Sequence, residues 1–141
     1  MINKRDRFIT ALANATQGSV LTDHEALEEA SYDFGRVVAG EPQLVVRPLN
    51  VADVVTIVRQ ARTWGWSISA RGAGHPQGGQ GVSRGGVVLD TRSLVTIEPP
   101  NPAEGSVVAG AGVLWSELLE VVMAHGLLPP VLTDHPKVTS G

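Results

Sequence analysis

Residues 44–70 carry the pattern strand, helix, strand, which constrains the fold more than any other part of the sequence. The apolar run LVVRP predicts a short strand that stops at Pro48. Asn50 can cap the helix that follows, Asp53 complements the positive end of that helix, and Gly65 ends it. SISA, residues 67–70, predicts the second strand. Two strands joined by a helix favour parallel pairing through a right-handed crossover, so the fold class is α/β or α+β.

The remaining elements follow from apolar spacing. An N-terminal helix is predicted from Phe8, Ile9, Leu12 and Ala15, ending near Gly18. GVVLD (residues 86–90) predicts a buried strand, and SVVAGAGV (106–113) predicts a fourth strand. A second amphipathic helix is predicted from Trp115, Leu118, Leu119 and Val122, with His125 in its last turn and Gly126 as its C-cap. We expect a helical lead-in over residues 1–40 and one domain over 41–141.

Composition excludes several classes of function. Of the 141 residues 43% are hydrophobic, which is enough for a packed core. The net charge is −3 without a basic cluster, so a nucleic-acid surface is not expected. The absence of cysteine rules out disulfides, thiolate zinc sites and cysteine nucleophiles. No run approaches the ~18–20 apolar residues that cross a bilayer, so we expect no membrane contact and a cytoplasmic location.

The stretch ARGAGHPQGGQG, residues 70–81, holds five glycines around a single histidine. It fails the dinucleotide fingerprint G-x-G-x-x-G, because Gln77 stands at the third glycine position and Pro76 lies where a helix should begin. It fails the P-loop pattern as well, since Gln80 and Gly81 replace the lysine and the hydroxyl residue. Two interpretations remain open. The loop amides form a nest for phosphate oxygens, with charge from Arg71, or the glycines only allow the chain to turn.

Two separated blocks resemble one family of flavoenzymes. SARGAGHPQGGQGVSRGGVVLDTRSL (69–94) resembles the flavin-binding loop of the vanillyl-alcohol-oxidase class, which has a PCMH-type FAD-binding domain. GLLPPVLTDHPKVTSG (126–141) resembles the segment of that class in which T-D-aromatic leads to T-x-G-G. The match extends upstream through PQLVVRPLNVADVVTIVRQARTWGWSIS (42–69) and is closest to cytokinin dehydrogenases. The resemblance implies an α+β fold, the N-terminal part of such a domain, with a small mixed sheet packed against helices.

The resemblance also implies roles for individual residues. His75 matches the histidine that is bonded through its ring to the 8α-methyl group of the flavin. Asp134 matches the catalytic aspartate that takes a proton from the substrate while a hydride leaves for the flavin. The implied FAD-binding set is Ala70, Gly72, Ala73, Gly74, His75, Pro76, Gln80, Asp134 and Thr139.

Two positions depart from the family pattern. Pro76 stands where serine is usual, which removes a hydroxyl and a backbone N–H donor, and His135 stands where an aromatic residue is common. Asp134 also allows a purely structural interpretation, in which it caps a turn before Pro136 instead of acting in catalysis. The histidines lack the spacing of metal ligands, so no metal site is expected.

These features favour the FAD-binding portion of an oxidoreductase that oxidises an amine or alcohol by hydride transfer. The sequence stops at VTSG, inside a motif that the family continues. The alternative is therefore a noncatalytic truncated or split fragment, which acts as a flavin-binding or assembly partner of another chain. A partner chain would then supply the missing half.

Overall fold

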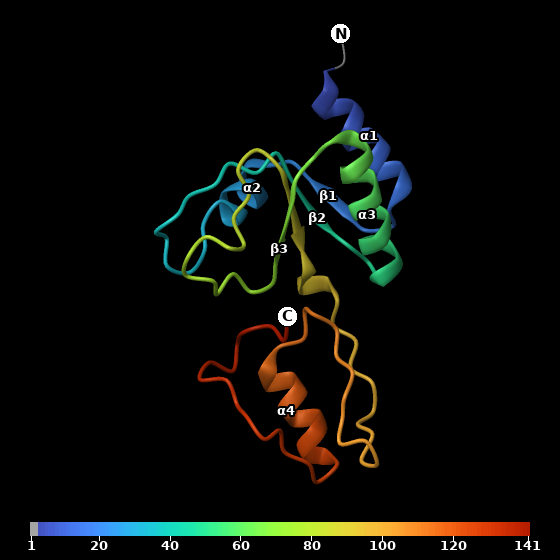
Figure 1. Ribbon diagram of the computed structural model, residues 1–141, viewed down its shortest axis with the longest axis vertical. Helices are drawn as coiled ribbons and strands as arrows, with labels where there is room; N and C mark the ends of the chain where they lie inside the picture. The colour runs from blue at the N-terminus through green and yellow to red at the C-terminus, as the bar shows by residue number, and fades with distance from the viewer. Residues whose placement is uncertain (1–2) are drawn as a thin grey trace.

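A four-stranded mixed sheet forms the centre of the computed structural model, which describes residues 3–141. The strands lie in the order β1–β2–β4–β3 (Figure 1). Their bounds are β1 Ser19–Leu21, β2 Leu44–Arg47, β3 Ile68–Arg71 and β4 Val87–Asp90. β4 pairs in parallel with both β2 and β3, and β1 pairs antiparallel with β2. This architecture confirms the expected α+β class.

The strand–helix–strand unit has the predicted elements, but its two strands are not neighbours. Helix α3 (Val51–Trp64) joins β2 to β3, and β4 lies between those strands. All four residues of β4 are buried, whereas Ala70 of β3 is exposed. A strand that is apolar on both faces is most stable in the middle of a sheet, so β4 takes that place and β3 lies at the edge.

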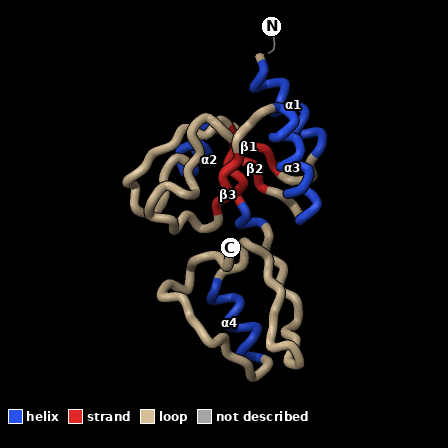
Figure 2. Tube along the Cα trace, viewed as in Figure 1, coloured by secondary structure: helices blue, strands red, loops and turns tan. Residues whose placement is uncertain are grey.

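Helices cover both faces of the sheet (Figure 2). Alternate strand residues point to opposite faces, so Val46 and Leu89 belong to one core and Val45 and Val88 to the other. Helix α1 (Lys4–Ala15) and α3 cover the first face, and α2 (His24–Ala30) covers the second. The larger core consists of Phe8, Leu12, Leu44, Val46, Ile57, Ala61, Val87 and Leu89.

The caps of α3 are those the sequence predicts. The Asn50 side chain accepts a hydrogen bond from the Asp53 N–H at 3.0 Å, and Gly65 ends the helix in the left-handed region with φ 71°. The buried Asp53 carboxylate also accepts from the N–H groups of Gln17 and Leu49, at 2.9 and 2.8 Å. Burial alone would raise the pKa of Asp53, but these backbone hydrogen bonds outweigh it and lower the pKa. Asp53 thereby ties the end of α1 to the start of α3.

Residues 94–141 form a second lobe around α4 (Trp115–Ala124), which lies below the sheet in Figure 1. Val113, Leu118 and Val122 form its small core. The helix and the left-handed Gly126 (φ 71°) agree with the sequence prediction. No helix among residues 3–141 is long and apolar enough to cross a membrane.

The strand predicted over residues 106–113 is wrong. This segment makes only isolated bridges, Ile97 with Ala109 and Asn101 with Ser106. The chain then turns, because the Val113 N–H donates to the Gly110 carbonyl at 3.0 Å. The lead-in is also more than a helix, since residues 19–21 form an edge strand and residues 24–30 form α2.

The core between α3 and the sheet supports a stability prediction. Ile57 is completely buried, whereas the next apolar residue of that helix, Val58, is 46% exposed. Ile57→Ala removes buried methyl groups and leaves a cavity, so we expect it to lower the free energy of unfolding by about 2–5 kcal/mol. Val58→Ala is the matched control, with a change below about 1 kcal/mol. Urea denaturation followed by circular dichroism measures both, and equal losses would contradict this core assignment.

Candidate functional site

The glycine loop leaves β3 and turns back along the sheet edge in a shape that requires glycine. Gly74 and Gly79 have φ of 79° and 83°, which side chains disfavour. At Gly72 the constraint is close approach instead. A Cβ there would overlap the Thr139 hydroxyl oxygen and lie 2.8 Å from the Gly141 carbonyl oxygen.

A cavity of about 310 Å³ lies between this loop and the end of the chain. Seven of the nine predicted FAD-binding residues line it, namely Ala70, Gly72, Ala73, Gly74, His75, Pro76 and Thr139. Thr91, Ala111, Val138 and Gly141 complete the wall together with Arg71. The structure therefore brings together two blocks that are about 60 residues apart in the sequence.

Several loop amides are free to bind a ligand. The Ala73 N–H donates to the Thr139 hydroxyl at 3.2 Å. Within residues 3–141, the N–H groups of Gly74, His75 and Gln77 donate to no protein acceptor. Neighbouring free amides are the donors from which anion nests are built.

His75 is the most unusual side chain of the site. Both of its ring nitrogens are buried, and neither has a hydrogen-bond partner among the described residues. The ring stacks on Phe34, with centroids 5.1 Å apart and an interplanar angle of 11°, and the His135 ring lies 4.7 Å away. Buried polar atoms are nearly always paired, so unpaired nitrogens beside a cavity indicate a place for a ligand.

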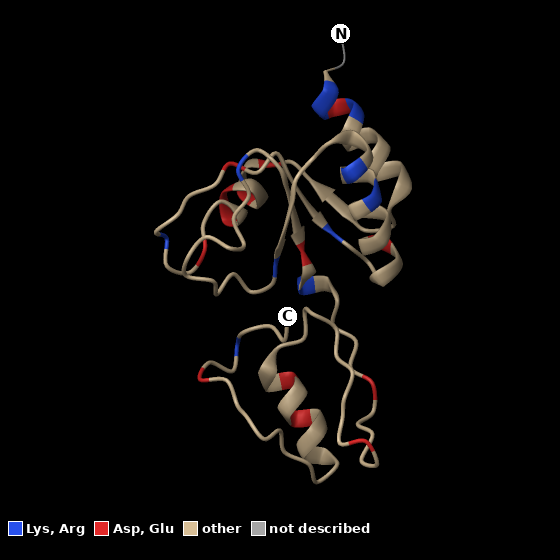
Figure 3. Ribbon diagram, viewed as in Figure 1, with Lys and Arg blue, Asp and Glu red and all other residues tan. Residues whose placement is uncertain are grey.

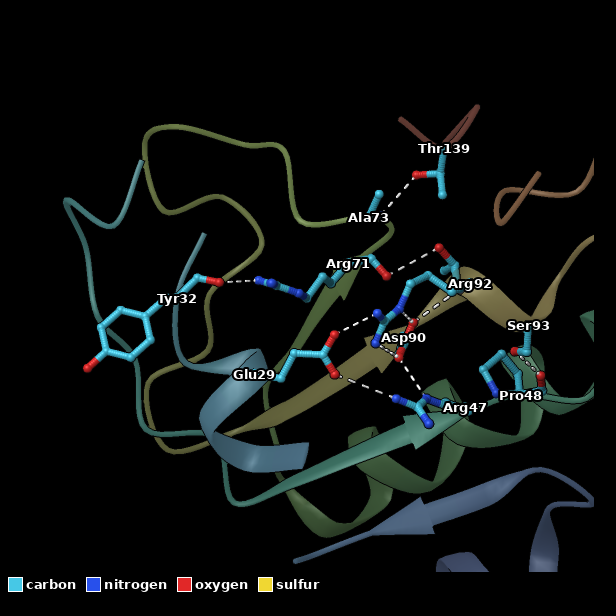
Figure 4. Close-up of polar contacts among 11 residues, drawn as sticks. Glu29, Tyr32, Arg47, Pro48, Arg71, Ala73, Asp90, Arg92, Ser93 and Thr139 are labelled. Carbon is cyan, nitrogen blue, oxygen red and sulfur yellow. Dashed lines mark hydrogen bonds and ion pairs between the residues drawn. The ribbon is translucent and has the colours of Figure 1, made fainter. Parts of the chain in front are cut away.

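Arg71 brings a positive charge to the start of the loop. Its guanidinium donates to the Tyr32 carbonyl at 2.5 Å (Figure 4) and would meet a Cβ on Gly74 at 2.5 Å. Burial lowers the pKa of Arg71 from its usual value. Among residues 3–141 Arg71 makes no ion pair within 4.0 Å, so its charge is not neutralised by direct contact with a carboxylate.

An ion-pair cluster holds the ends of the strands below the loop (Figure 4). The Asp90 carboxylate, only 2% exposed, accepts from Arg47 at 2.8 Å and from Arg92 at 2.7 Å. Arg92 also pairs with Glu29 of α2 at 2.6 Å. Burial would raise the pKa of Asp90, but the two arginines outweigh it and lower the pKa. The hydrogen bond from Arg92 is the main reason that the pKa of Glu29 is lowered.

Gln80 and Asp134 lie outside the cavity wall. The Gln80 side chain turns back and accepts from the Gly78 N–H at 3.1 Å. Asp134 is exposed, and within residues 3–141 its side chain accepts one hydrogen bond, from the Thr133 hydroxyl at 3.5 Å. The next residue, His135, has its ring centroid 4.7 Å from that of His75.

These geometric features agree with the comparisons with known proteins. A family model described as FAD binding domain matches residues 42–141. The chain belongs to the FAD binding domain family. This result confirms the resemblance to a PCMH-type FAD-binding domain.

Relatives place the chain near cytokinin dehydrogenases. It is 35% identical over 123 residues to cytokinin dehydrogenase 7 of Oryza sativa subsp. japonica, covering 83% of this chain and 24% of that protein. It is 37% identical over 120 residues to an uncharacterized oxidoreductase of Rhodococcoides fascians, covering 85% of this chain and 27% of that protein. The chain thus spans about a quarter of the length of these relatives.

Solved structures share the fold. 6-Hydroxy-D-nicotine oxidase from Arthrobacter nicotinovorans matches with a TM-score of 0.76 and 31% identity, over 88% of this chain and 27% of the oxidase. An alkyldihydroxyacetonephosphate synthase matches with a TM-score of 0.82 over 94% of this chain and 30% of the synthase. Its 18% identity supports the fold alone.

The residues present fit FAD by their own chemistry. Free loop amides suit the pyrophosphate, and a Cβ would close the approach at Gly72. The unpaired His75 nitrogens face no protein partner among residues 3–141. Sequence reasoning missed Asp33 and Phe34, which contact the loop from another segment. Both residues lie outside the sequence blocks that resemble the family, so no local signal pointed to them.

The Asp90 cluster yields a prediction on pH. Because the folded pKa of Asp90 is depressed, its contribution to stability is present above the unfolded pKa of about 3.9 and is lost as pH falls through the folded value. Asp90→Asn removes the carboxylate that Arg47 and Arg92 share. Because both arginines are partly exposed and stay hydrated, we expect a cost of about 1–3 kcal/mol at pH 7.

Thermal unfolding from pH 7 to pH 2 measures this effect. The gap between the variant and the wild type should begin to narrow below about pH 4 and should close only below the folded pKa of Asp90, where Asp90 is protonated and neutral in both states. Asp134→Asn changes an exposed carboxylate and is the matched control, with little change at either pH. A constant gap between Asp90→Asn and wild type down to pH 2 would contradict the assignment.

Proposed function

We propose that this chain holds the FAD of an oxidoreductase of the cytokinin dehydrogenase-like type, which oxidises an amine or an alcohol. The observation that carries the proposal is the cavity between the glycine loop and Thr139, whose wall includes Gly74 and His75 with their free amides; the His75 ring nitrogens are buried and unpaired among the described residues. The N–H groups of Gly74 and His75 would hold the pyrophosphate, and Arg71 would complement its charge. FAD supplies the redox chemistry by accepting a hydride.

His75 is proposed to carry the flavin covalently. A ring nitrogen of His75 would form the bond to the 8α carbon of FAD, with one proton lost from the ring and one from that carbon. The two electrons of this oxidation would pass to an external oxidant such as dioxygen. The position of His75 supports this role, since the residue lines the cavity and no protein group among the described residues bonds its buried ring nitrogens.

Asp134 is proposed as the base that takes a proton from the substrate. It lies next to His135, whose ring is 4.7 Å from that of His75, so the chain carries this carboxylate toward the candidate linkage site. It is exposed to water in this structure. A general base works best in a site from which water is excluded, so we expect the substrate and the rest of the enzyme to cover Asp134.

A noncatalytic assembly role is the second proposal. Apolar side chains of the second lobe are widely exposed, with Leu128 at 70% and Val131 at 74%. Apolar surface of this kind favours contact with a further protein surface. If this role is the whole function, the chain will bind a partner without taking up flavin.

The loop glycines give a direct test of FAD binding. Gly72→Ala places a methyl group against Thr139 and Gly141, so we expect it to abolish FAD uptake. Gly81→Ala is the matched control in the same loop, because its Cβ would meet no atom closer than 3.7 Å. Flavin absorbance of the purified chain after incubation with FAD measures both. Equal uptake by the two variants would contradict the proposed placement.

Covalent attachment is tested by intact mass under denaturing conditions. We expect wild type to gain the mass of one FAD less the hydrogens lost on linkage, and His75→Ala to gain nothing. His125→Ala, at an exposed histidine on the C-cap of α4, is the control and should gain the same mass as wild type. A mass gain that survives His75→Ala would place the linkage elsewhere.

A further inference from the structure

Segment 32–38, between α2 and β2, is a closed loop that lies against the glycine loop. Tyr32 and Ala39 form an antiparallel bridge at its base, and the Gly40 N–H donates to the Ser31 carbonyl at 2.8 Å. Inside the segment, the Arg36 N–H donates to the Asp33 carbonyl at 3.2 Å. These bonds give the segment its own fixed shape.

Three hydrogen bonds join segment 32–38 to the start, middle and end of the glycine loop. The Tyr32 carbonyl accepts from the Arg71 guanidinium, and the Phe34 N–H donates to the Pro76 carbonyl at 3.2 Å. The Asp33 carboxylate accepts from the Gly79 N–H at 2.6 Å. Asp33 is only 3% exposed, so this bond to a charged acceptor is shielded from water and strong.

The two segments also fit closely where no hydrogen bond joins them. A Cβ on Gly79 would lie 2.9 Å from the Val38 Cβ, and a Cβ on Gly35 would lie 3.0 Å from the Gln77 carbonyl oxygen. Glycine at both positions lets the backbones approach. The left-handed turn at Gly79 (φ 83°) is thus held from one side by Val38 and from its N–H by Asp33.

Phe34 stands out because it is 64% exposed and yet lies nearly parallel to the His75 ring, at 11°. An exposed aromatic side chain contributes little to the core, but such a stack fixes the plane of its partner. An aromatic pair is worth roughly a twofold to tenfold change in an equilibrium constant. The unpaired His75 nitrogens leave ring stacking as the main contact that orients this side chain within residues 3–141.

We propose that segment 32–38 is a clamp that sets the shape of the glycine loop, and that Phe34 is the positioning residue for the His75 ring. The clamp acts in the free chain. Its consequence for flavin attachment rests on the proposed function, because a ring held in one plane reacts faster with a bound partner than a ring that rotates.

The first test uses the full 141-residue chain without flavin, observed by NMR. Phe34→Leu keeps apolar bulk but removes the ring, so the His75 ring protons should lose the shielding of a stacked neighbour and move downfield. Phe34→Tyr keeps the ring and should leave them unchanged. Val37→Ala, at a position that is 79% exposed in the same segment, is a further control without effect. Unchanged His75 resonances in a folded Phe34→Leu variant would overturn the positioning role.

The second test measures the clamp without touching Phe34. Asp33→Asn preserves the side-chain shape but replaces the charged acceptor of the Gly79 N–H by a neutral amide. The weaker hydrogen bond should raise the hydrogen-exchange rate of the Gly79 amide by about tenfold. The Gly65 amide, at the far end of α3, is the internal reference and should not change. Unchanged exchange at Gly79 would overturn the clamp, and this measurement also decides the case if Phe34→Leu fails to fold.

The third measurement adds FAD and follows covalent mass with time. Phe34→Leu should slow attachment about tenfold, while Phe34→Tyr matches wild type. If wild type takes up no flavin, the proposed function fails, and the ring shifts and amide exchange of the free chain still decide the clamp. If Phe34→Leu attaches FAD at the wild-type rate, the positioning role in attachment is wrong.

Discussion

The rest of the structure depends on the burial of β4 from both sides. Its residues Val87, Val88 and Leu89 alternate between the two cores, so neither face of the sheet is stable without a helical layer over it. The strand ends in Asp90, a carboxylate that is expensive to bury alone. Arg47 and Arg92 offset this cost, and Arg92 reaches on to Glu29 of α2. One strand therefore fixes the layers and the polar junction at their edge.

That junction explains where the ligand cavity lies. β3 pairs with β4 up to Arg71 beside Asp90, and the glycine loop leaves the sheet after this pair. The Thr91 hydroxyl donates to the Arg71 carbonyl at 3.3 Å, which ties the start of the loop to the strand that organises the sheet. Figure 3 shows acidic residues on α2, the helix that packs over this side of the sheet. The free loop amides and the Arg71 guanidinium are positive groups on the glycine loop, opposite in sign to the acidic residues of α2.

Much of this fold could be predicted from the sequence, because capping and periodicity are local signals. Asn50, Gly65 and the apolar stripe of α3 bounded that helix correctly, and the apolar run in β4 identified a buried strand. The strand order could not be predicted, since it depends on the burial of whole strands. β1 was not predicted, because a strand of three residues is too short to show an alternating pattern. The run over 106–113 was predicted as a strand, but the chain turns at the glycines 110 and 112.

Part of the candidate site could likewise be predicted from the sequence, and part could not. The motif residues that line the cavity could be named from the resemblance, because glycine and histidine stand at fixed spacing in one loop. Asp33 and Phe34 reach that loop across about 40 residues of sequence, and contacts of this kind have no local signature. The exposure of Asp134 and the inward fold of Gln80 also depend on tertiary packing.

The Ala73–Thr139 hydrogen bond joins residues 66 positions apart and closes the cavity from opposite walls. A molecule that contacts both walls binds more tightly when residues 138–141 lie against the loop after β3 than when they do not. Thermodynamic linkage makes the relation reciprocal, so a bound molecule stabilises the contact between these two segments by the same factor.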